Sequence, residues 1–207
     1  MASMRVLVTG FGPFPGVPVN PTDAAVQALR RRAPEDLPGL DLITAILPVD
    51  LALIPGLVGD FIAQHEPELV VCTGVASGSR VIRVERVAVN LVDARVPDAN
   101  GFQPIDIPVV AGAPDGLLAT LPVKAIHAAI TALGLPAEVA LSAGTYGCNA
   151  AMFAALHGAA PGVRAGFLHI PDADVLDADA VASALAATVR ACLEHDEDLA
   201  VHGGAIA

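Results

Sequence analysis

The sequence alternates short runs of β-branched and aliphatic residues with alanine-rich segments of helical length, and this alternation is the strongest constraint on the fold. Alanine supplies 40 of the 207 residues, which favours tightly packed helices. Strands are predicted at residues 5–9, 40–47, 69–73, 81–92, 139–143 and 165–170, and helices at 21–32, 50–64, 121–133, 148–157 and 177–193. Because strands and helices take turns along the chain, the expected fold is an α/β sandwich with a largely parallel sheet.

Prolines locate helix ends and one loop within this pattern. Asn20 is a good N-cap and Pro21 suits the first helical position, so the first helix is predicted to begin there. Pro55 would kink the second helix or delay its start. The proline-rich segment 93–108 is predicted to be a long loop. Residues 1–207 are expected to form a single catalytic domain, with flexible ends at residues 1–3 and 196–207.

Charge and cysteine usage narrow the class of protein. The 11 basic and 22 acidic residues give a net charge of −11, which would repel a nucleic acid. The start of the sequence lacks the long apolar stretch of a secretion signal, so a cytoplasmic protein is expected. Residues 139–163 are uncharged, but polar members such as Asn149 and His157 indicate a buried strand, turn and helix, with no membrane span. The three cysteines include no ligand-spaced pair, so we expect reduced thiols, no metal site and no cofactor.

The glycine-rich turn after the first strand is a candidate pocket element. Residues 10–16 have the glycine content of a phosphate-binding loop, but Pro13 and Pro15 lack the amide hydrogens that such a loop needs. Phe11 and Phe14 stand at the end of a strand, where aromatic rings form either a plug over the core or a wall of a pocket. The residue types are compatible with both interpretations.

Cys148 is the strongest candidate for a reactive group. It follows the turn 144–147 and opens an apolar helix, where the positive end of the helix dipole favours a thiolate. The backbone amides of the same helix end would face a developing oxyanion. Cys72, by contrast, is predicted to be a buried core residue of a strand, with a packing role only. Cys192 lies near acidic residues, whose field would raise the pKa of its thiol.

Two further residues have the chemistry to assist this thiol. His169 ends a predicted strand, where it could act as a base and then protonate a leaving amine, or simply bond to a backbone carbonyl. Glu85 is a carboxylate in an otherwise apolar strand, and a buried carboxylate needs a partner. Arg86 is one candidate partner, but adjacent residues of a strand point to opposite faces, which leaves an imidazole as the other.

Taken in order along the chain, these residues resemble pyroglutamyl peptidase type I, also called pyrrolidone-carboxylate peptidase, a family of cysteine peptidases. The resemblance covers nearly the whole chain and depends on Gly10-Phe11, Pro13-Phe14, Asn20-Pro21, Glu85-Arg86 with Ala88 and Asn90, Asp93-Ala94-Arg95 with Pro97-Asp98, Gly101 with Gln103-Pro104, Ala143-Gly144 before Cys148-Asn149, and His169 with Pro171. It implies a three-layer α/β/α sandwich around an open mixed sheet. It also implies a homo-oligomer, either a tetramer or a dimer, that acts on peptides with an N-terminal pyroglutamate.

The resemblance implies a role for each matching position. Cys148 would be the nucleophile, His169 the base and Glu85 the carboxylate that orients it. Arg95 would join the Cys148 amide in holding the oxyanion. The lactam ring would bind among apolar and aromatic residues, which suit a neutral ligand: Phe11, Phe14, Val75, Tyr146 and Gly147.

Several positions depart from the family pattern. Val75 stands where glutamine is common, and Val49 stands where a threonine follows the family's Leu-Pro. Ahead of the nucleophile, Ala140-Leu141 replaces a Ser-Asn pair, and Tyr146-Gly147 replaces a bulkier aromatic-valine pair. These changes leave the triad intact, so they bear on the geometry of the pocket.

Two alternatives come from other functional classes. A catalytically altered family member could use the pocket as a binding module for a small cyclic amide or a partner chain. A phosphate-using transferase on a similar sandwich, such as a nucleoside phosphorylase, is the other alternative. The prolines of the first turn and the acidic charge argue against the transferase.

Overall fold

The computed structural model describes residues 3–14 and 17–204. Its strands are β1 (Met4–Phe11), β2 (Leu40–Leu47), β3 (Leu69–Val75), β4 (Ile82–Glu85), β5 (Val87–Val89), β6 (Gly116–Leu118), β7 (Ala137–Ala140) and β8 (Arg164–Ile170). Its helices are α1 (Pro21–Asp36), α2 (Ile54–His65), α3 (Val123–Ala132), α4 (Gly147–Gly158) and α5 (Ala178–Glu194). Pro15 and the outermost residues of the two predicted flexible ends, 1–2 and 205–207, lie outside the described residues.

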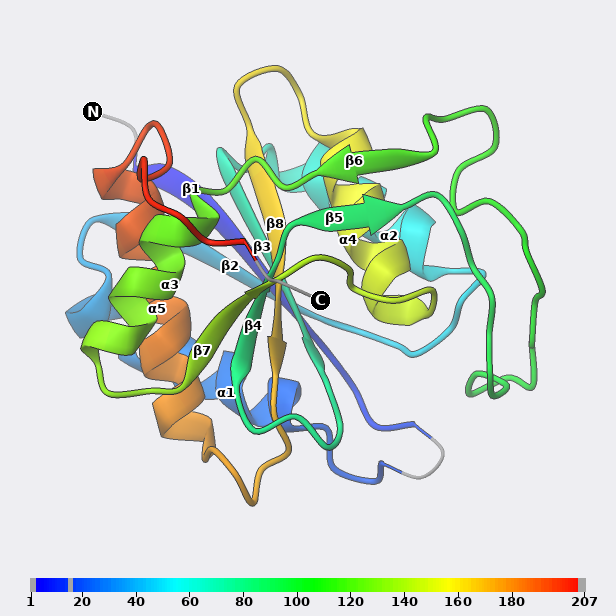
Figure 1. The fold of residues 1–207 in the computed structure, drawn as a ribbon, viewed down its shortest axis with the longest axis horizontal. Coiled ribbons are helices and arrows are strands. Elements are labelled where there is room, and N and C mark those ends of the chain that lie inside the picture. The colour runs from blue at the N-terminus through cyan, green and yellow to red at the C-terminus, as the bar shows by residue number, and fades with distance from the viewer. Residues whose placement is uncertain (1–2, 15–16, 205–207) are drawn as a thin grey trace.

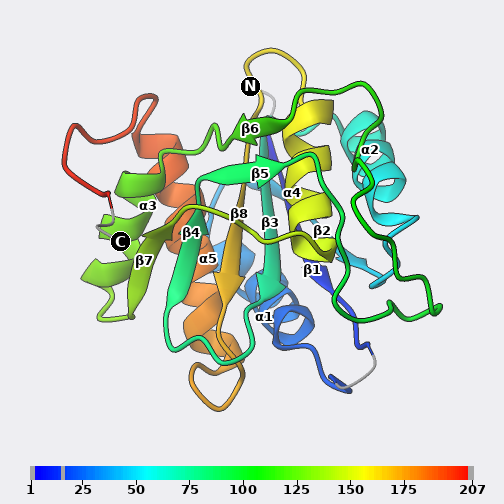
Figure 2. The ribbon, with the colours of Figure 1, turned by 45° about the vertical axis from the view of Figure 1, so that its right-hand side comes forward.

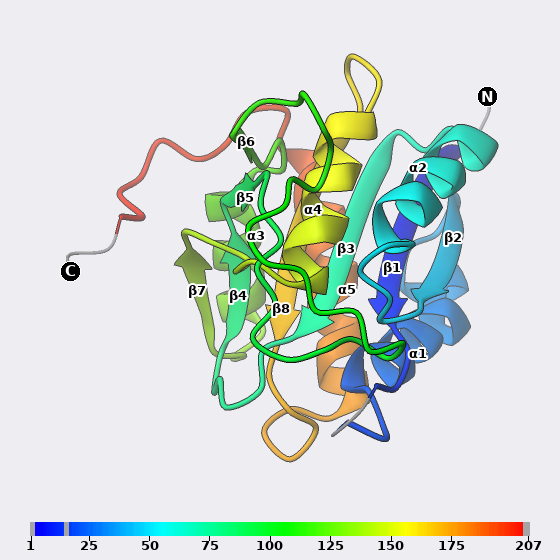
Figure 3. The same cartoon turned by 90° about the vertical axis from the view of Figure 1, so that its right-hand side faces the viewer.

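The main sheet has six strands in the order β2-β1-β3-β8-β4-β7. Neighbouring strands run parallel except at the β8/β4 boundary, where the pairing is antiparallel. Helices α1, α3 and α5 cover one face and α2 and α4 the other (Figures 1 and 3). The predicted three-layer sandwich with an open, largely parallel mixed sheet is therefore confirmed.

The central strands are apolar on both sides because both faces of the sheet are covered. Val6 and Val8 of β1 pack on the face of α1 and α5, and Leu7 packs on the face of α2 and α4. All three side chains are fully buried. A nearly continuous apolar run is the pattern expected for a parallel strand between two helical layers.

The strand predicted at 81–92 is divided in the structure, so that prediction is wrong at its centre. It breaks at Arg86, whose amide donates to the Ala140 carbonyl and whose carbonyl accepts from the Ala119 amide. Before the break the chain belongs to the main sheet as β4. After it, β5 pairs with the unpredicted β6 in a small second sheet beside α4 (Figure 2). Alternating hydrophobicity continues through the break, so the pattern does not reveal a change of sheet.

The remaining elements agree with expectation to within a few residues. Pro55 lies in the first turn of α2, which begins later than predicted because Asp50 caps a preceding turn through the amides of Ala52 and Leu53. Residues 93–108 form the expected long loop, and an isolated bridge between Val92 and Ile107 brings its two ends together. Strand β7 begins and ends earlier than predicted.

The C-terminal segment contacts the start of α3. The Asp198 carboxylate accepts from the backbone amides of Lys124 and Ala125 at 2.9 and 3.1 Å. These amides lie in the first turn of the helix, where no intrahelical acceptor exists. The single domain and its flexible ends stay predictions. Among the helices that the structure describes, none is both long enough and apolar enough to cross a membrane.

Candidate active site

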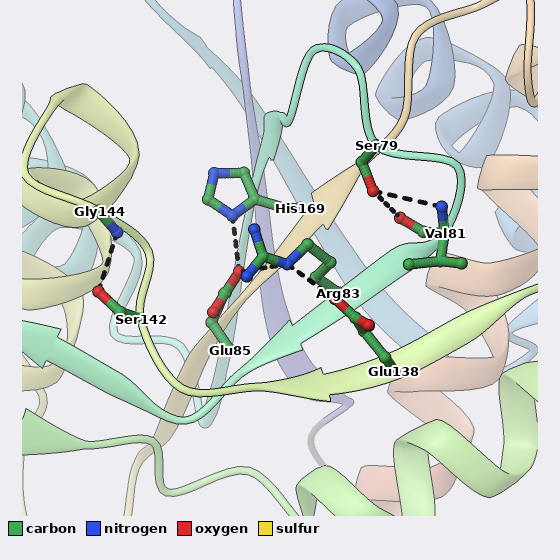
Figure 4. A network of polar contacts seen from close by, with 8 residues as sticks. All are labelled: Ser79, Val81, Arg83, Glu85, Glu138, Ser142, Gly144 and His169. Carbon is green, nitrogen blue, oxygen red and sulfur yellow. Dashed lines mark hydrogen bonds and ion pairs between the residues drawn. The ribbon is translucent and has the colours of Figure 1, made fainter. Parts of the chain in front are cut away.

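Strands β8 and β4 bring His169 and Glu85 together. In the antiparallel pairing His169 lies opposite Arg83, so Glu85 is its diagonal neighbour on the same face of the sheet. The distance from His169 Nδ1 to Glu85 Oε1 is 2.8 Å, and both side chains are buried (Figure 4). Because a carboxylate only accepts, the Nδ1–H group donates this bond. The partner of Glu85 is therefore the imidazole and not Arg86.

Cys148 approaches the same histidine from α4. Its sulfur lies over Gly74 of β3, the register neighbour of His169, and Cys148 contributes to the raised pKa of that imidazole. A Cβ atom on Gly74 would overlap the Cys148 sulfur and would lie 2.8 Å from Phe167 Cζ. Phe167 in turn packs edge-on against the His169 ring, with centroids 4.8 Å apart. Glycine at position 74 thus creates the space in which the sulfur meets the imidazole.

The surroundings of His169 favour its protonated form. Burial disfavours the imidazolium, but the charge and hydrogen bonds of Cys148 and Glu85 outweigh burial and raise the pKa of His169 from 6.5 to about 9. At neutral pH the proton therefore resides on the imidazole, between a sulfur and a carboxylate. A protonated imidazole in this position can give its proton to a bound ligand while a carboxylate holds the ring.

The start of α4 leaves the Cys148 amide without an intrahelical acceptor. The first helical bond runs from the Ala150 amide to the Tyr146 carbonyl at 3.0 Å, so the Cys148 amide has no acceptor within the helix. Asn149 fixes this helix end, since its side chain bonds the backbone of Val89 and Leu91 at 2.8 to 3.0 Å. Arg95 is exposed in the adjoining loop and does not line the cavity beside Cys148.

A cavity of about 170 Å³ opens beside Cys148. All five predicted pocket residues line it, together with Cys148 itself and three others: Asn20, Val49 and Val96. The Asn20 amide is occupied by Gly12 O and Thr22 N, so the side chains offer mostly apolar surface. A cavity of about 150 Å³ is large enough for benzene, so this one is suited to a single small ring. Phe11 and Phe14 form a pocket wall.

The structure shows the surroundings of two departures from the family pattern, Gly147 and Leu141. A Cβ atom on Gly147 would lie 3.1 Å from Cδ1 of the fully buried Ile54, so a larger residue would press on the core. Leu141 is 60% exposed and lies outside the cavity lining. Val96 was not predicted as a lining residue, because nothing in a loop sequence indicates which side chain turns toward the site.

The loop 93–108 is fastened to the pocket by a buried carboxylate. Asp98 accepts from the amides of Leu51, Asn100 and Phe102 at 2.9 Å each. Burial opposes ionisation of Asp98, but these three bonds outweigh it and lower the pKa of the carboxyl below its ordinary value of 3.8. The Tyr146 hydroxyl donates to the Pro97 carbonyl at 3.2 Å, which joins the same loop to the turn before Cys148.

We expect Asp98→Ala to weaken both stability and binding. The buried amide of Leu51 and the part-buried amides of Asn100 and Phe102 would lose their acceptor. An unsatisfied buried group costs about 1–3 kcal/mol, and Val96 would no longer be held beside the cavity. Thermal unfolding and steady-state kinetics should show a lower Tm and a KM raised several-fold. Asp98→Asn retains part of the bonding and should lie between the two proteins. Wild-type KM in a folded Asp98→Ala protein would show that this loop does not shape the pocket.

The other candidate groups are structural. Cys72 and Cys192 are buried, and burial raises the pKa of their thiols to about 11 and about 12. For Cys192 the cause is therefore burial and not the acidic neighbours that the sequence suggested. His65 and His157 stack on phenylalanines of their own helices. Over residues 3–14 and 17–204, no three His, Cys, Asp or Glu side chains gather in a metal-binding cluster.

Comparisons with known proteins agree with this geometry. The profile of the pyroglutamyl peptidase family matches residues 4–194. The pyrrolidone-carboxylate peptidase of Clavibacter michiganensis subsp. michiganensis is 42% identical, with 97% of this chain and 98% of that protein covered. That of Thermococcus onnurineus is 44% identical, with 81% and 84% covered.

Solved structures give the same result. The pyrrolidone carboxyl peptidase from Thermococcus litoralis superposes with a TM-score of 0.88 at 32% identity, with 96% of this chain and 99% of that chain covered. The pyroglutamyl peptidase I from Bacillus amyloliquefaciens gives the same TM-score and coverage at 30% identity. Because the family profile matches residues 4–194 and a curated relative is 42% identical over 97% of this chain, the chain belongs to the pyroglutamyl peptidase family of enzymes.

Proposed function

We propose that this protein is a cysteine exopeptidase that removes N-terminal pyroglutamyl residues from peptides through Cys148, His169 and Glu85. The observation that carries the proposal is the His169–Glu85 hydrogen bond beside the Cys148 sulfur, which lies over Gly74, the register neighbour of His169, next to an apolar cavity of about 170 Å³. Family membership supports the reaction type, and the relatives are named for the same activity.

The reaction divides into two steps at the Cys148 sulfur. The thiolate attacks the pyroglutamyl carbonyl, and the resulting oxyanion is held by the Cys148 amide. Arg95, which is exposed in the adjoining loop, would have to turn toward Cys148 to add a second donor. His169 then gives its proton to the leaving amine, which breaks the peptide bond and leaves an acyl-enzyme. Water, deprotonated by His169, attacks this thioester and releases pyroglutamate and the free thiolate. Glu85 holds the imidazole and stabilises its charged form throughout.

The cavity accounts for the choice of substrate. A pyroglutamyl ring is neutral and small, so it is bound by apolar walls without a charged clamp. Phe11, Phe14, Val75, Tyr146 and Gly147 supply these walls in the proposal. Because the ring is closed, the substrate has no free N-terminal amine for the site to neutralise. An exopeptidase also needs no binding sites for residues further along the peptide. The protein is expected to work as a cytoplasmic homo-oligomer without a cofactor, as a single catalytic domain.

Release of a coumarin fluorophore from pyroglutamyl-aminocoumarin tests the proposal directly. We expect turnover of this substrate and none of the prolyl and alanyl analogues, in the presence of a thiol reductant. A folded protein that binds pyroglutamyl amides without turnover would instead be the binding module. Turnover of the prolyl analogue at a similar rate would contradict the assignment of the pocket.

Glu85→Gln tests the orienting carboxylate. The amide retains the shape but not the charge, so kcat should fall at least roughly tenfold with KM little changed. The alkaline limb of the pH profile should move to lower pH, because the pKa of His169, about 9 in the wild type, is raised in part by Glu85. Glu194→Gln, a change on the far helical layer, serves as the control. Wild-type kcat with an unmoved limb would reduce the machinery to Cys148 and His169.

A further inference from the structure

Arg83 lies behind the carboxylate of the proposed triad. It shares a face of β4 with Glu85, and its Nε atom is 3.7 Å from Glu85 Oε1 (Figure 4). The same Nε atom is 3.1 Å from Oε1 of Glu138 on β7. Register explains the arrangement, because Arg83 is paired with His169 on one side and with Glu138 on the other. A row of alternating charges therefore runs across three strands from Glu138 to His169.

Exposure falls steeply along this row. The side chain of Glu138 is 53% exposed and that of Arg83 34%, while Glu85 is fully buried. Glu85 Oε2 is buried and has no hydrogen-bond partner among the described residues. The hydrogen bond from His169 Nδ1 and the ion pair with Arg83 Nε both fall on Oε1, and this Nε atom makes no hydrogen bond to the described residues. A carboxylate held through one oxygen can rotate if one of its two partners is removed.

Arg83 also affects the net charge around the proposed triad. In the reactive form, Cys148 and Glu85 each carry a negative charge and His169 one positive charge, which leaves one negative charge uncompensated in a buried site. Arg83 places a positive charge beside Glu85 from the adjacent β4 position, and Glu138, which pairs with Arg83 on its other side, is 53% exposed, so the negative charge of Glu138 is solvated. Burial of an unbalanced charge is costly, so the positive charge of Arg83 lowers the cost of burying Glu85.

We propose that Arg83, anchored by Glu138, is a positioning residue that holds Glu85 Oε1 toward His169 and balances the charge of the triad. The proposal rests on the proposed function, because it assigns Arg83 a role through the Glu85–His169 pair. The charged and titratable groups that face this pair are Arg83 on β4, Glu138 behind it on β7, Cys148 on α4 and the buried Cys72 on β3.

The competing explanation is an ordinary surface ion pair between Arg83 and Glu138. Such pairs contribute little, because both side chains are solvated and screened. The two explanations predict different effects on the pKa of His169, both in direction and in size. Loss of a positive charge beside the triad should stabilise the His169 imidazolium, and loss of the negative charge on Glu138 should destabilise it. An isolated surface pair predicts no effect on the imidazole in either case.

The test compares Arg83→Gln, Arg83→Lys and Glu138→Gln with a matched control. The control is Arg5→Gln, which removes a similarly exposed partner of the 3.6 Å Arg5–Glu66 pair at the amino end of β1. For each protein we would measure kcat and KM against pH. The His169 imidazole would also be titrated by NMR, with its resonance assigned through His169→Gln, and this second measurement does not depend on the peptidase activity.

We expect Arg83→Gln to lower kcat by roughly three- to tenfold, with KM within about twofold of the wild type. In Arg83→Gln the alkaline limb of the pH profile and the pKa of His169 should rise by about half a pH unit. In Glu138→Gln both should fall. Arg83→Lys retains the charge and should restore the wild-type limb and part of kcat. Arg5→Gln should match the wild type in every measurement.

The proposal is overturned if Arg83→Gln and Glu138→Gln leave the His169 titration and kcat unchanged, or if Arg5→Gln produces the same shifts. If Arg83→Gln fails to fold, the opposite-sign shift in Glu138→Gln decides the question, and an unmoved titration there counts against Arg83. A wild-type protein without pyroglutamyl turnover would refute the proposed function alone, since the imidazole shifts are measured independently.

Discussion

Cys148→Ser should fold like the wild type and lose at least roughly a thousandfold in kcat/KM, the loss typical when the nucleophile of such a triad is removed. The expected loss follows from the protonation of the His169 imidazole. His169 carries it at neutral pH because Cys148 and Glu85 raise its pKa to about 9. A serine hydroxyl cannot supply the negative charge of a thiolate, so the imidazole would lose one of its two partners. Its titration by NMR should accordingly move to lower pH.

Alkylation provides an independent check of the same residue. Iodoacetamide should label Cys148 first, because it is partly exposed, whereas Cys72 and Cys192 are buried with thiol pKa values of about 11 and about 12. Labelling of Cys148 should parallel the loss of turnover. Full activity in Cys148→Ser, or preferential labelling of Cys192 in the folded protein, would contradict the assignment of the nucleophile.

Gly74→Ala should reduce kcat/KM by at least roughly a hundredfold, because small displacements of a reacting group are costly. The added methyl group would overlap the Cys148 sulfur and lie 2.8 Å from Phe167 Cζ, so one or both must move away from His169. No backbone strain contributes, since the φ angle of Gly74 is not positive. The protein should still fold, with a lower Tm.

A glycine elsewhere serves as the matched control for this prediction. Gly56 lies in α2, where a Cβ atom would meet nothing within 4 Å, so Gly56→Ala should retain full activity. Kinetics, thermal unfolding and the rate of Cys148 alkylation would be compared between the two variants. Wild-type turnover in Gly74→Ala would show that the reactive sulfur does not lie over β3.

The sequence singled out candidate site residues, but it did not reveal which strands and side chains surround them. Cys148 was identifiable because a helix start changes the chemistry of a thiol, and Glu85 because a carboxylate in an apolar strand needs a partner. Both signals are local. Arg83 gave no such signal, because its importance depends on which strands lie beside β4, and strand order is not encoded in local periodicity. Gly74 went unnoticed for the same reason.

The same difference applies to the fold: elements set by neighbouring residues were predicted, and features set by residues far away in the sequence were not. Helix α1 was predicted at its start, where Asn20 and Pro21 act locally, and β2 was predicted residue for residue. The break at Arg86 was missed because it depends on Ala140 and Ala119, far away in the sequence. The three residues of β6 are too few to show any alternation.

The antiparallel pairing of β4 with β8 also affects when activity can arise. The bond between Glu85 and His169 joins residues 84 positions apart, and Cys148 reaches them from a third element. Contacts of such long range close late in folding, because the loop entropy must be overcome before they form. A chain that has not completed this sheet therefore holds the three groups apart. We therefore expect a nascent or unfolded chain to be inert, with hydrolysis beginning only once the fold is complete.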